Sequence, residues 1–260
     1  MLACSNHPGP WRQTPGVETA IADVTWQQDL TTRARPVSTA IGAGLLMGGL
    51  IGGVGGRLSM FVLRLTSAPS LHGVETDDGF TIGVFSGATL FLVIMTCVLG
   101  MLGGILYLVV RTWLPVAWRT GLTGVFGGIV GGTAVIRPGG IDFTLLDPLP
   151  LAIVMFVGLP AIYGVAMSRL VERRLNAEIE PRGWPASLLG LVPLVLLGFV
   201  GFVGLAVAVV MSMLFVLHRA APEVTALWRS TSVVWIGRAA LLGVTGVAFA
   251  GLIRDVVQVL

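Results

Sequence analysis

The chain has few charged side chains and no lysine at all. Only 11% of its 260 residues are charged, whereas a soluble domain carries about 25%. All 16 basic residues are arginine, a bias that is typical of a GC-rich bacterial genome. The formal net charge is only +3, which lacks the strongly basic balance of a nucleic-acid-binding protein, so we expect no nucleic-acid partner.

Cysteine is also scarce, and complete catalytic or metal-binding patterns are missing. The two cysteines lie in a polar tail (Cys4) and in an apolar run (Cys97), which argues against a disulfide between them. The three histidines have no local spacing that would hold zinc. The segment around Ser86 superficially resembles an intramembrane serine protease motif, but its spacing is wrong by one residue. No predicted span has a mid-membrane histidine that would activate the serine. We therefore expect no catalytic residue, no metal and no cofactor, and the sequence leans away from an enzyme.

Long apolar runs make up most of the chain, of which 55% is hydrophobic. A helix that crosses a membrane needs about 20 consecutive, predominantly apolar residues. Six runs meet this requirement, at residues 38–65, 82–110, 117–136, 150–170, 187–217 and 233–253. The sequence therefore predicts an all-α fold, a polytopic membrane helix bundle of about six transmembrane helices formed by residues 37–260.

Residues 1–36 precede these runs and are polar, with four prolines. They contain no apolar core segment of the kind that a cleavable signal peptide requires. A segment of this composition cannot bury enough apolar surface to fold. We therefore expect a largely disordered, cytoplasmic N-terminal tail.

The placement of arginines predicts the orientation, because cytoplasmic segments are enriched in them. With the N-terminus inside, the outer side holds Arg57, Arg64, Arg137, Arg219, Arg229 and Arg238, and the inner side holds the other ten arginines, Arg254 among them. Trp113 and Trp118 then fall at the inner interface and Trp235 at the outer one. The sequence thus predicts a multi-pass protein of the bacterial inner (plasma) membrane with both termini in the cytoplasm.

Glycine is abundant, with 36 residues, and recurs at every fourth position in two of the predicted spans. This spacing places residues on one helix face, and a face without side chains lets a second helix approach closely in a membrane. The rows of this glycine zipper are Gly44, Gly48, Gly52 and Gly56 in the first span and Gly124, Gly128 and Gly132 in the third. We expect these two spans to meet backbone to backbone; the alternative is that the rows line a pore or let helices slide.

Two arginines follow the first glycine row. Arg57 continues the spacing of Gly49 and Gly53, and Arg64 lies about two turns further on nearly the same face. A buried guanidinium in a membrane requires a partner. Carboxylates of the expected outer loops are the candidates, and the resulting candidate ligand-binding set is Arg57, Arg64, Asp77, Asp78, Arg137 and Asp142.

Two interpretations of this set are open. In the first, the arginines tie the helix end to two acidic loops and serve only the structure. In the second, they line an outward-facing cavity in which the planar guanidinium fork binds a phosphate or carboxylate. Asp77 and Asp78 before Gly79 are typical of a turn, and neighbouring arginines would keep them ionised, which favours salt bridges over proton transfer.

The pattern of Gly55-Gly56-Arg57, Met60 and Arg64, followed by the run from Thr76 to Gly83, resembles a family of uncharacterised bacterial multi-pass integral membrane proteins. The resemblance covers about residues 40–175. It implies that these outer-side residues form one unit, and it implies no activity.

A segment of mixed charge, residues 169–182, follows the fourth predicted span. We expect it to extend that span as a solvated helix whose charges pair at four-residue spacing. Its arginines are also candidates for contact with anionic lipid, and the segment is a candidate for docking a partner.

Three classes of function are compatible with these features. A structural, accessory or scaffold component needs only packing and topology, which is what the sequence provides. A small transporter or channel for an anionic or lipid-like solute would use the arginines of the candidate set, and an enzyme acting on lipid or envelope substrates would need two of the loop aspartates in one pocket. We favour the first, with the bilayer, a second copy or another membrane protein as partner, and the transporter as the alternative.

Overall fold

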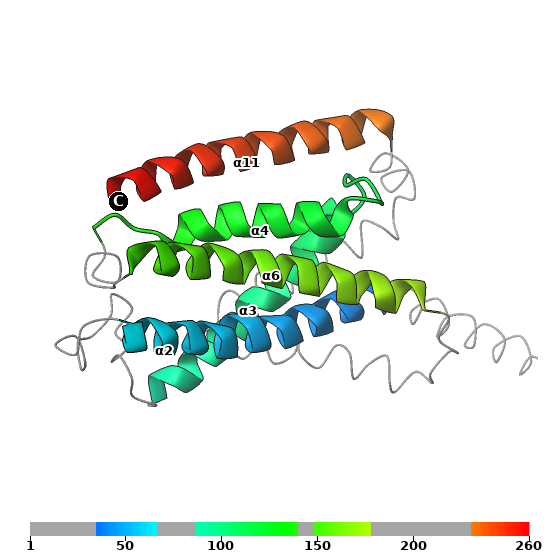
Figure 1. Ribbon diagram of the computed structural model, residues 1–260. Coiled ribbons are helices and arrows are strands. Elements are labelled where there is room, and N and C mark those ends of the chain that lie inside the picture. Colours follow the sequence, from blue (N-terminus) through cyan, green and yellow to red (C-terminus); the bar gives the residue numbers. More distant parts are fainter. Residues whose placement is uncertain (1–34, 67–86, 140–147, 178–229, 260) are drawn as a thin grey trace, which may run out of the picture.

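The computed structural model describes residues 35–66, 87–139, 148–177 and 230–259, and this part of the chain is all-helical (Figure 1). Residues 35–47 form an α-helix that continues without a break through two further elements, and we call the whole stretch helix 35–66. The elements are the π-helix η1 (Gly48–Gly55), α2 (Gly56–Thr66), α3 (Gly87–Val110), α4 (Arg119–Val135), α6 (Leu149–Asn176) and α11 (Thr231–Val259).

Four helices in the described part are long and apolar enough to cross a membrane. They are Arg35–Leu63, Leu90–Val110, Leu149–Asn176 and Thr231–Val259. They correspond to the predicted spans 38–65, 82–110, 150–170 and 233–253. The fifth predicted span, 187–217, lies outside the described residues, as does the tail 1–34, and α4 has only 17 residues. The chain is thus a membrane-type helix bundle, while the count of six stays a prediction.

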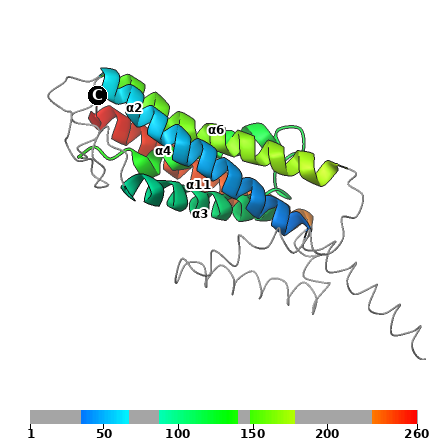
Figure 2. The ribbon, with the colours of Figure 1, turned by 90° about the horizontal axis from the view of Figure 1, so that it is seen from below.

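The helices lie side by side with α6 in a central position (Figures 1 and 2). Helix α6 packs against α4, against η1 and α2, and against α3. Helix η1 packs most closely on α3, and α11 packs on α4. Side chains that are apolar and exposed on the outer surfaces of the bundle, such as Leu90, Leu242 and Val247, suit contact with lipid tails.

Helix 35–66 approaches α3 through glycines on both partners. A β-carbon added at Gly48 would lie 2.9 Å from the α-carbon of Gly100, and one added at Gly44 would collide with the carbonyl oxygen of Gly100. A β-carbon at Gly104 would in turn collide with the carbonyl oxygen of Ala40. Because neither helix presents a side chain at these points, the two backbones pack directly on each other.

Helices α4 and α6 form a second close pair. A β-carbon added at Gly127 would lie 2.6 Å from the carbonyl oxygen of Pro160, and one at Gly128 would lie 3.1 Å from the β-carbon of Ala161. The expectation that the first and third predicted spans meet backbone to backbone is therefore wrong. Each glycine row faces the helix that follows it in the chain.

Gly56, the last member of the first row, stands apart from this packing. Gly56 is buried, but a β-carbon added there would meet no atom of the described residues within 4 Å. The physical reason lies in η1, because a π-helix closes its turns with i→i+5 hydrogen bonds and so rotates later residues away from a four-residue row. The row is regular in the sequence, but the face is not regular in the structure.

Helix α11 runs in the direction opposite to the one we expected. The Nε atom of Arg238 donates to the carbonyl oxygen of Trp113 at 2.8 Å, so α11 begins beside the α3–α4 connection. At its other end, Leu252 packs with Ile136 and Ala152. Arg238 and Trp113, which were expected on opposite sides of the membrane, thus share one end of the bundle. The prediction depended on an alternation of directions through residues 187–217, which lie outside the described part.

One end of the bundle is therefore rich in arginine, and we call it the basic end. Of the 11 arginines in the described residues, seven lie there, as their contacts and their positions at the end of α6 show: Arg35, Arg111, Arg119, Arg169, Arg173, Arg174 and Arg238. The other four belong to the opposite half, because they lie on α2, just after α4 and near the end of α11: Arg57, Arg64, Arg137 and Arg254. The residues that open helix 35–66 and close α11 lie at different ends, contrary to the expectation that both termini of the membrane domain share a side.

Candidate functional site

The most elaborate polar arrangement in the described residues is centred on Glu172, near the end of α6. This residue continues a row with Gly164 and Ser168 at four-residue spacing, and the two preceding members are buried. Its side chain consequently points into the bundle rather than into solvent. Tyr107 in the last turn of α3, Arg111 just beyond it and Arg119 at the start of α4 surround it.

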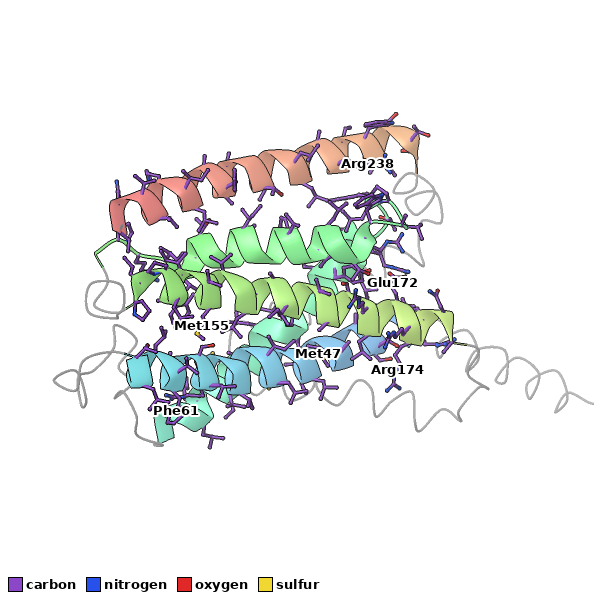
Figure 3. All side chains as sticks on the ribbon, in the orientation of Figure 1. Met47, Phe61, Met155, Glu172, Arg174 and Arg238 are labelled. Carbon is purple, nitrogen blue, oxygen red and sulfur yellow. The ribbon has the colours of Figure 1, made fainter. Side chains whose placement is uncertain are left out.

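The carboxylate of Glu172 accepts four hydrogen bonds from these three side chains. Tyr107 donates its hydroxyl to Oε1 at 2.7 Å. Arg111 binds both oxygens, with Nε 3.1 Å from Oε1 and Nη2 3.0 Å from Oε2, and Arg119 donates Nη1 to Oε1 at 3.2 Å. Figure 3 shows Glu172 at the basic end, on the same side as Arg174 and Arg238. We call these four side chains the Glu172 cluster.

The Glu172 cluster is largely withdrawn from water. The side chain of Glu172 is 18% exposed and that of Arg119 is 12% exposed, while Tyr107 is buried. Charge-assisted hydrogen bonds of this kind are roughly twice as strong as neutral ones, and a bidentate contact also fixes geometry. Oε1 accepts three of these hydrogen bonds and Oε2 accepts one, so most of the roughly four lone-pair positions of the carboxylate are occupied by donors from other segments. The arrangement is suited to holding α3, α4 and α6 together.

Further polar contacts connect the same helices elsewhere. The Tyr163 hydroxyl on α6 donates to the Gly100 carbonyl oxygen on α3 at 2.6 Å. Thr133 on α4 donates to the Ala248 carbonyl oxygen on α11 at 2.8 Å. Arg35 donates Nη2 to the carbonyl oxygen of Ala177 at 2.8 Å, at the end of α6. The Tyr163 and Thr133 contacts satisfy partly buried polar groups, the Arg35 contact is exposed, and all three connect segments that are distant in the sequence.

The candidate set predicted on the opposite half is described only in part. Arg57 lies on α2 with its Nε and Nη2 atoms buried, and the residue interacts with a neighbouring group. Arg137 follows α4 and is exposed, and the backbone of Arg64 belongs to α2. Asp77, Asp78 and Asp142 lie outside the described residues, so the pairing of these arginines with loop acids stays a prediction.

Sequence reasoning missed the role of Glu172. We expected residues 169–182 to be solvated and to pair along their own helix, whereas Glu172 binds arginines from two other segments. The available signal was the row of Gly164, Ser168 and Glu172, which continues a small-residue packing face to the end of the helix. Within the described residues, no group of three or more histidine, cysteine or acidic side chains could hold a metal ion.

No family model, curated protein or solved structure matches this chain. The resemblance of residues 40–175 to uncharacterised bacterial membrane proteins therefore stays a prediction. Function has to be argued from the geometry of the bundle itself.

Proposed function

We propose that the protein is a structural, accessory or scaffold component of a bacterial inner membrane. The observation that carries this proposal is the carboxylate of Glu172, which is largely withdrawn from water and accepts four hydrogen bonds that join three helices. A side chain that binds or transfers a solute must be able to exchange its hydrogen-bond partners within the protein for the solute. The glycine contacts between helix 35–66 and α3 add to the argument, since directly packed backbones resist displacement.

We further propose that the basic end faces the cytoplasm. It holds seven of the 11 described arginines, and a bias of arginine toward one side is the main determinant of orientation. Residue 35 then lies on the cytoplasmic side, consistent with a cytoplasmic tail, and Val259 lies on the outer side. The site residues Arg57, Arg64 and Arg137 keep the outer placement that was predicted for them.

Labelling of single cysteines tests this orientation. In a protein whose Cys4 and Cys97 are replaced by serine and alanine, we expect a membrane-impermeant maleimide to modify Arg254→Cys in intact spheroplasts. Val116→Cys, in the α3–α4 connection, should react only after the membrane is opened. Labelling of both positions from the same side would contradict the arrangement of α11, and the cysteine-free protein gives the background.

One observation favours the alternative, a small transporter or channel with an outward-facing arginine-lined site. The π-helix η1 ends directly before the α2 segment that holds Arg57, and π-helical turns within α-helices are frequent at functional sites. A solute that meets Arg57 from outside would be anionic or lipid-like. The structural role remains our preference because the described polar contacts join helices to each other.

Reconstitution of the full-length protein distinguishes the two functions. We expect proteoliposomes to take up radiolabelled phosphate or acetate no faster than empty liposomes, and Arg57→Gln to lower the amount of protein in the membrane. Uptake above the empty-liposome rate that is abolished by Arg57→Gln at normal incorporation would contradict the structural role and establish transport. Native mass spectrometry of the same preparation reports whether a second copy is bound.

A further inference from the structure

We propose that the α3–α4 connection at the basic end binds the phosphate group of an anionic phospholipid. The connection runs from Arg111 to Trp118 and joins two helices that both contribute arginine to the Glu172 cluster. This inference rests on the cytoplasmic orientation proposed above for the basic end, but not on the structural role, because a scaffold and a transporter could each carry such a site.

The Glu172 cluster has too few hydrogen-bond acceptors for its donors. Two guanidinium groups offer ten N–H donors, and the single carboxylate accepts three hydrogen bonds from them. The Nε atom of Arg119 is buried and has no hydrogen-bond partner in the part of the chain that the structure describes. Two positive charges also face one negative charge, so the cluster carries a net charge of +1. A second anion with several oxygens would supply the further hydrogen-bond acceptors and the negative charge that the single carboxylate does not provide.

A third cation lies against the same connection. Arg238 donates Nε to the Trp113 carbonyl oxygen at 2.8 Å and stands 5.3 Å from the centre of the Trp235 ring. Its guanidinium is thereby held beside the α3–α4 connection, where Figure 3 shows it at the start of α11. Helix α4 begins at this point as well, with no side-chain cap and no acidic residue in its first turn. Its N-terminal N–H groups add a positive field to that of the arginines.

The surface of the connection favours a lipid over a soluble ion as the source of the anion. Between the arginines, the connection presents apolar side chains outward: Val116 is 79% exposed and Trp118 is 71% exposed. Tryptophan is enriched at the depth of lipid headgroups, where its ring is partly apolar and partly wet. Cationic pockets between membrane helices on the cytoplasmic side bind anionic headgroups. A phospholipid offers a phosphate to the arginines and an apolar chain to Val116 and Trp118.

Binding of defined lipids to the purified full-length protein tests the proposal. In neutral detergent, we expect phosphatidylglycerol to stay bound in native mass spectrometry and to raise the melting temperature. Phosphatidylcholine at the same concentration should do neither. Inorganic phosphate should not raise the melting temperature, and an equal effect of phosphate would overturn the lipid in favour of a soluble anion.

Two variants identify the site. Arg238→Gln removes one cation outside the Glu172 cluster, and we expect it to weaken phosphatidylglycerol binding about fivefold, the effect of one basic residue near an anionic lipid surface. Trp118→Ser should also weaken binding, because it removes the ring that would contact the lipid chain. The substitution should spare the fold, since the Trp118 side chain is exposed and makes no side-chain cap. Arg254→Gln, a matched loss of charge at the opposite end, should leave the affinity unchanged. Unaltered affinity in both test variants would overturn the proposal.

Discussion

Replacement of Glu172 by glutamine is expected to lower the free energy of unfolding by about 2–4 kcal/mol. The substitution keeps the shape of the side chain and removes the negative charge that Arg111 and Arg119 share. Two partly buried cations would then face each other without a counter-ion. We place the effect below that of a fully buried pair because the side chain of Glu172 is 18% exposed. Thermal or denaturant unfolding in detergent, followed by tryptophan fluorescence, measures it.

A double-mutant cycle separates this interaction from general damage. Tyr107→Phe removes one donor to the same carboxylate without changing the packing of the ring. If the Glu172 cluster acts as a unit, the two substitutions together should cost less than the sum of their separate costs. Additive effects, or a loss of under about 0.5 kcal/mol for Glu172→Gln, would contradict the interpretation of the cluster as the contact that holds three helices together.

Alanine at Gly44 is expected to destabilise the bundle by about 1–3 kcal/mol, whereas alanine at Gly42 should be neutral or stabilising by up to about 1 kcal/mol. A β-carbon at Gly44 would collide with the Gly100 carbonyl oxygen on α3. At Gly42, two residues earlier in the same helix, it would meet no atom of residues 35–66, 87–139, 148–177 or 230–259 within 4 Å. Because the obstacle at Gly44 is backbone, it can yield only if the two helices separate.

The two glycine variants control for each other, since both make the same chemical change in one helix. Melting temperature and the amount of folded protein recovered from membranes are the measurements. Equal behaviour of Gly44→Ala and Gly42→Ala would show that helix 35–66 and α3 do not pack through Gly44. A valine at each position should widen the difference, because the larger side chain has more volume to place against α3.

The existence of most helices could be predicted from the sequence, because a membrane span requires a long apolar run whatever its neighbours are. The identity of the neighbours could not. Gly48 and Gly128 lie in similar rows, yet the first faces α3 and the second faces α6, since a row specifies a bare face and not the helix that covers it. The π-helical geometry of η1 could not be predicted from the sequence either, and it rotates Gly56 away from the face formed by the first glycine row.

The candidate site was harder to predict than the fold. Glu172 stands among arginines of its own helix, so charge spacing indicated local pairs, whereas its partners are contributed by residues 53 and 61 positions away. The direction of α11 was missed for a related reason. Arginine counting assigns a side to each connection, but Arg238 is compatible with either side until its contact with Trp113 is known.

The relative directions of α4 and α11 have a consequence for biosynthesis. Helix α4 and its main partner α6 run in opposite directions and follow each other closely in the chain, as do helix 35–66 and α3 (Figure 1). Each of these pairs can leave the ribosome and enter the bilayer as a hairpin. Helix α11 runs parallel to α4, so it cannot arrive as one arm of a hairpin with that partner. It follows that α11 joins by lateral docking in the bilayer, after the surface of α4 that receives it has been synthesised.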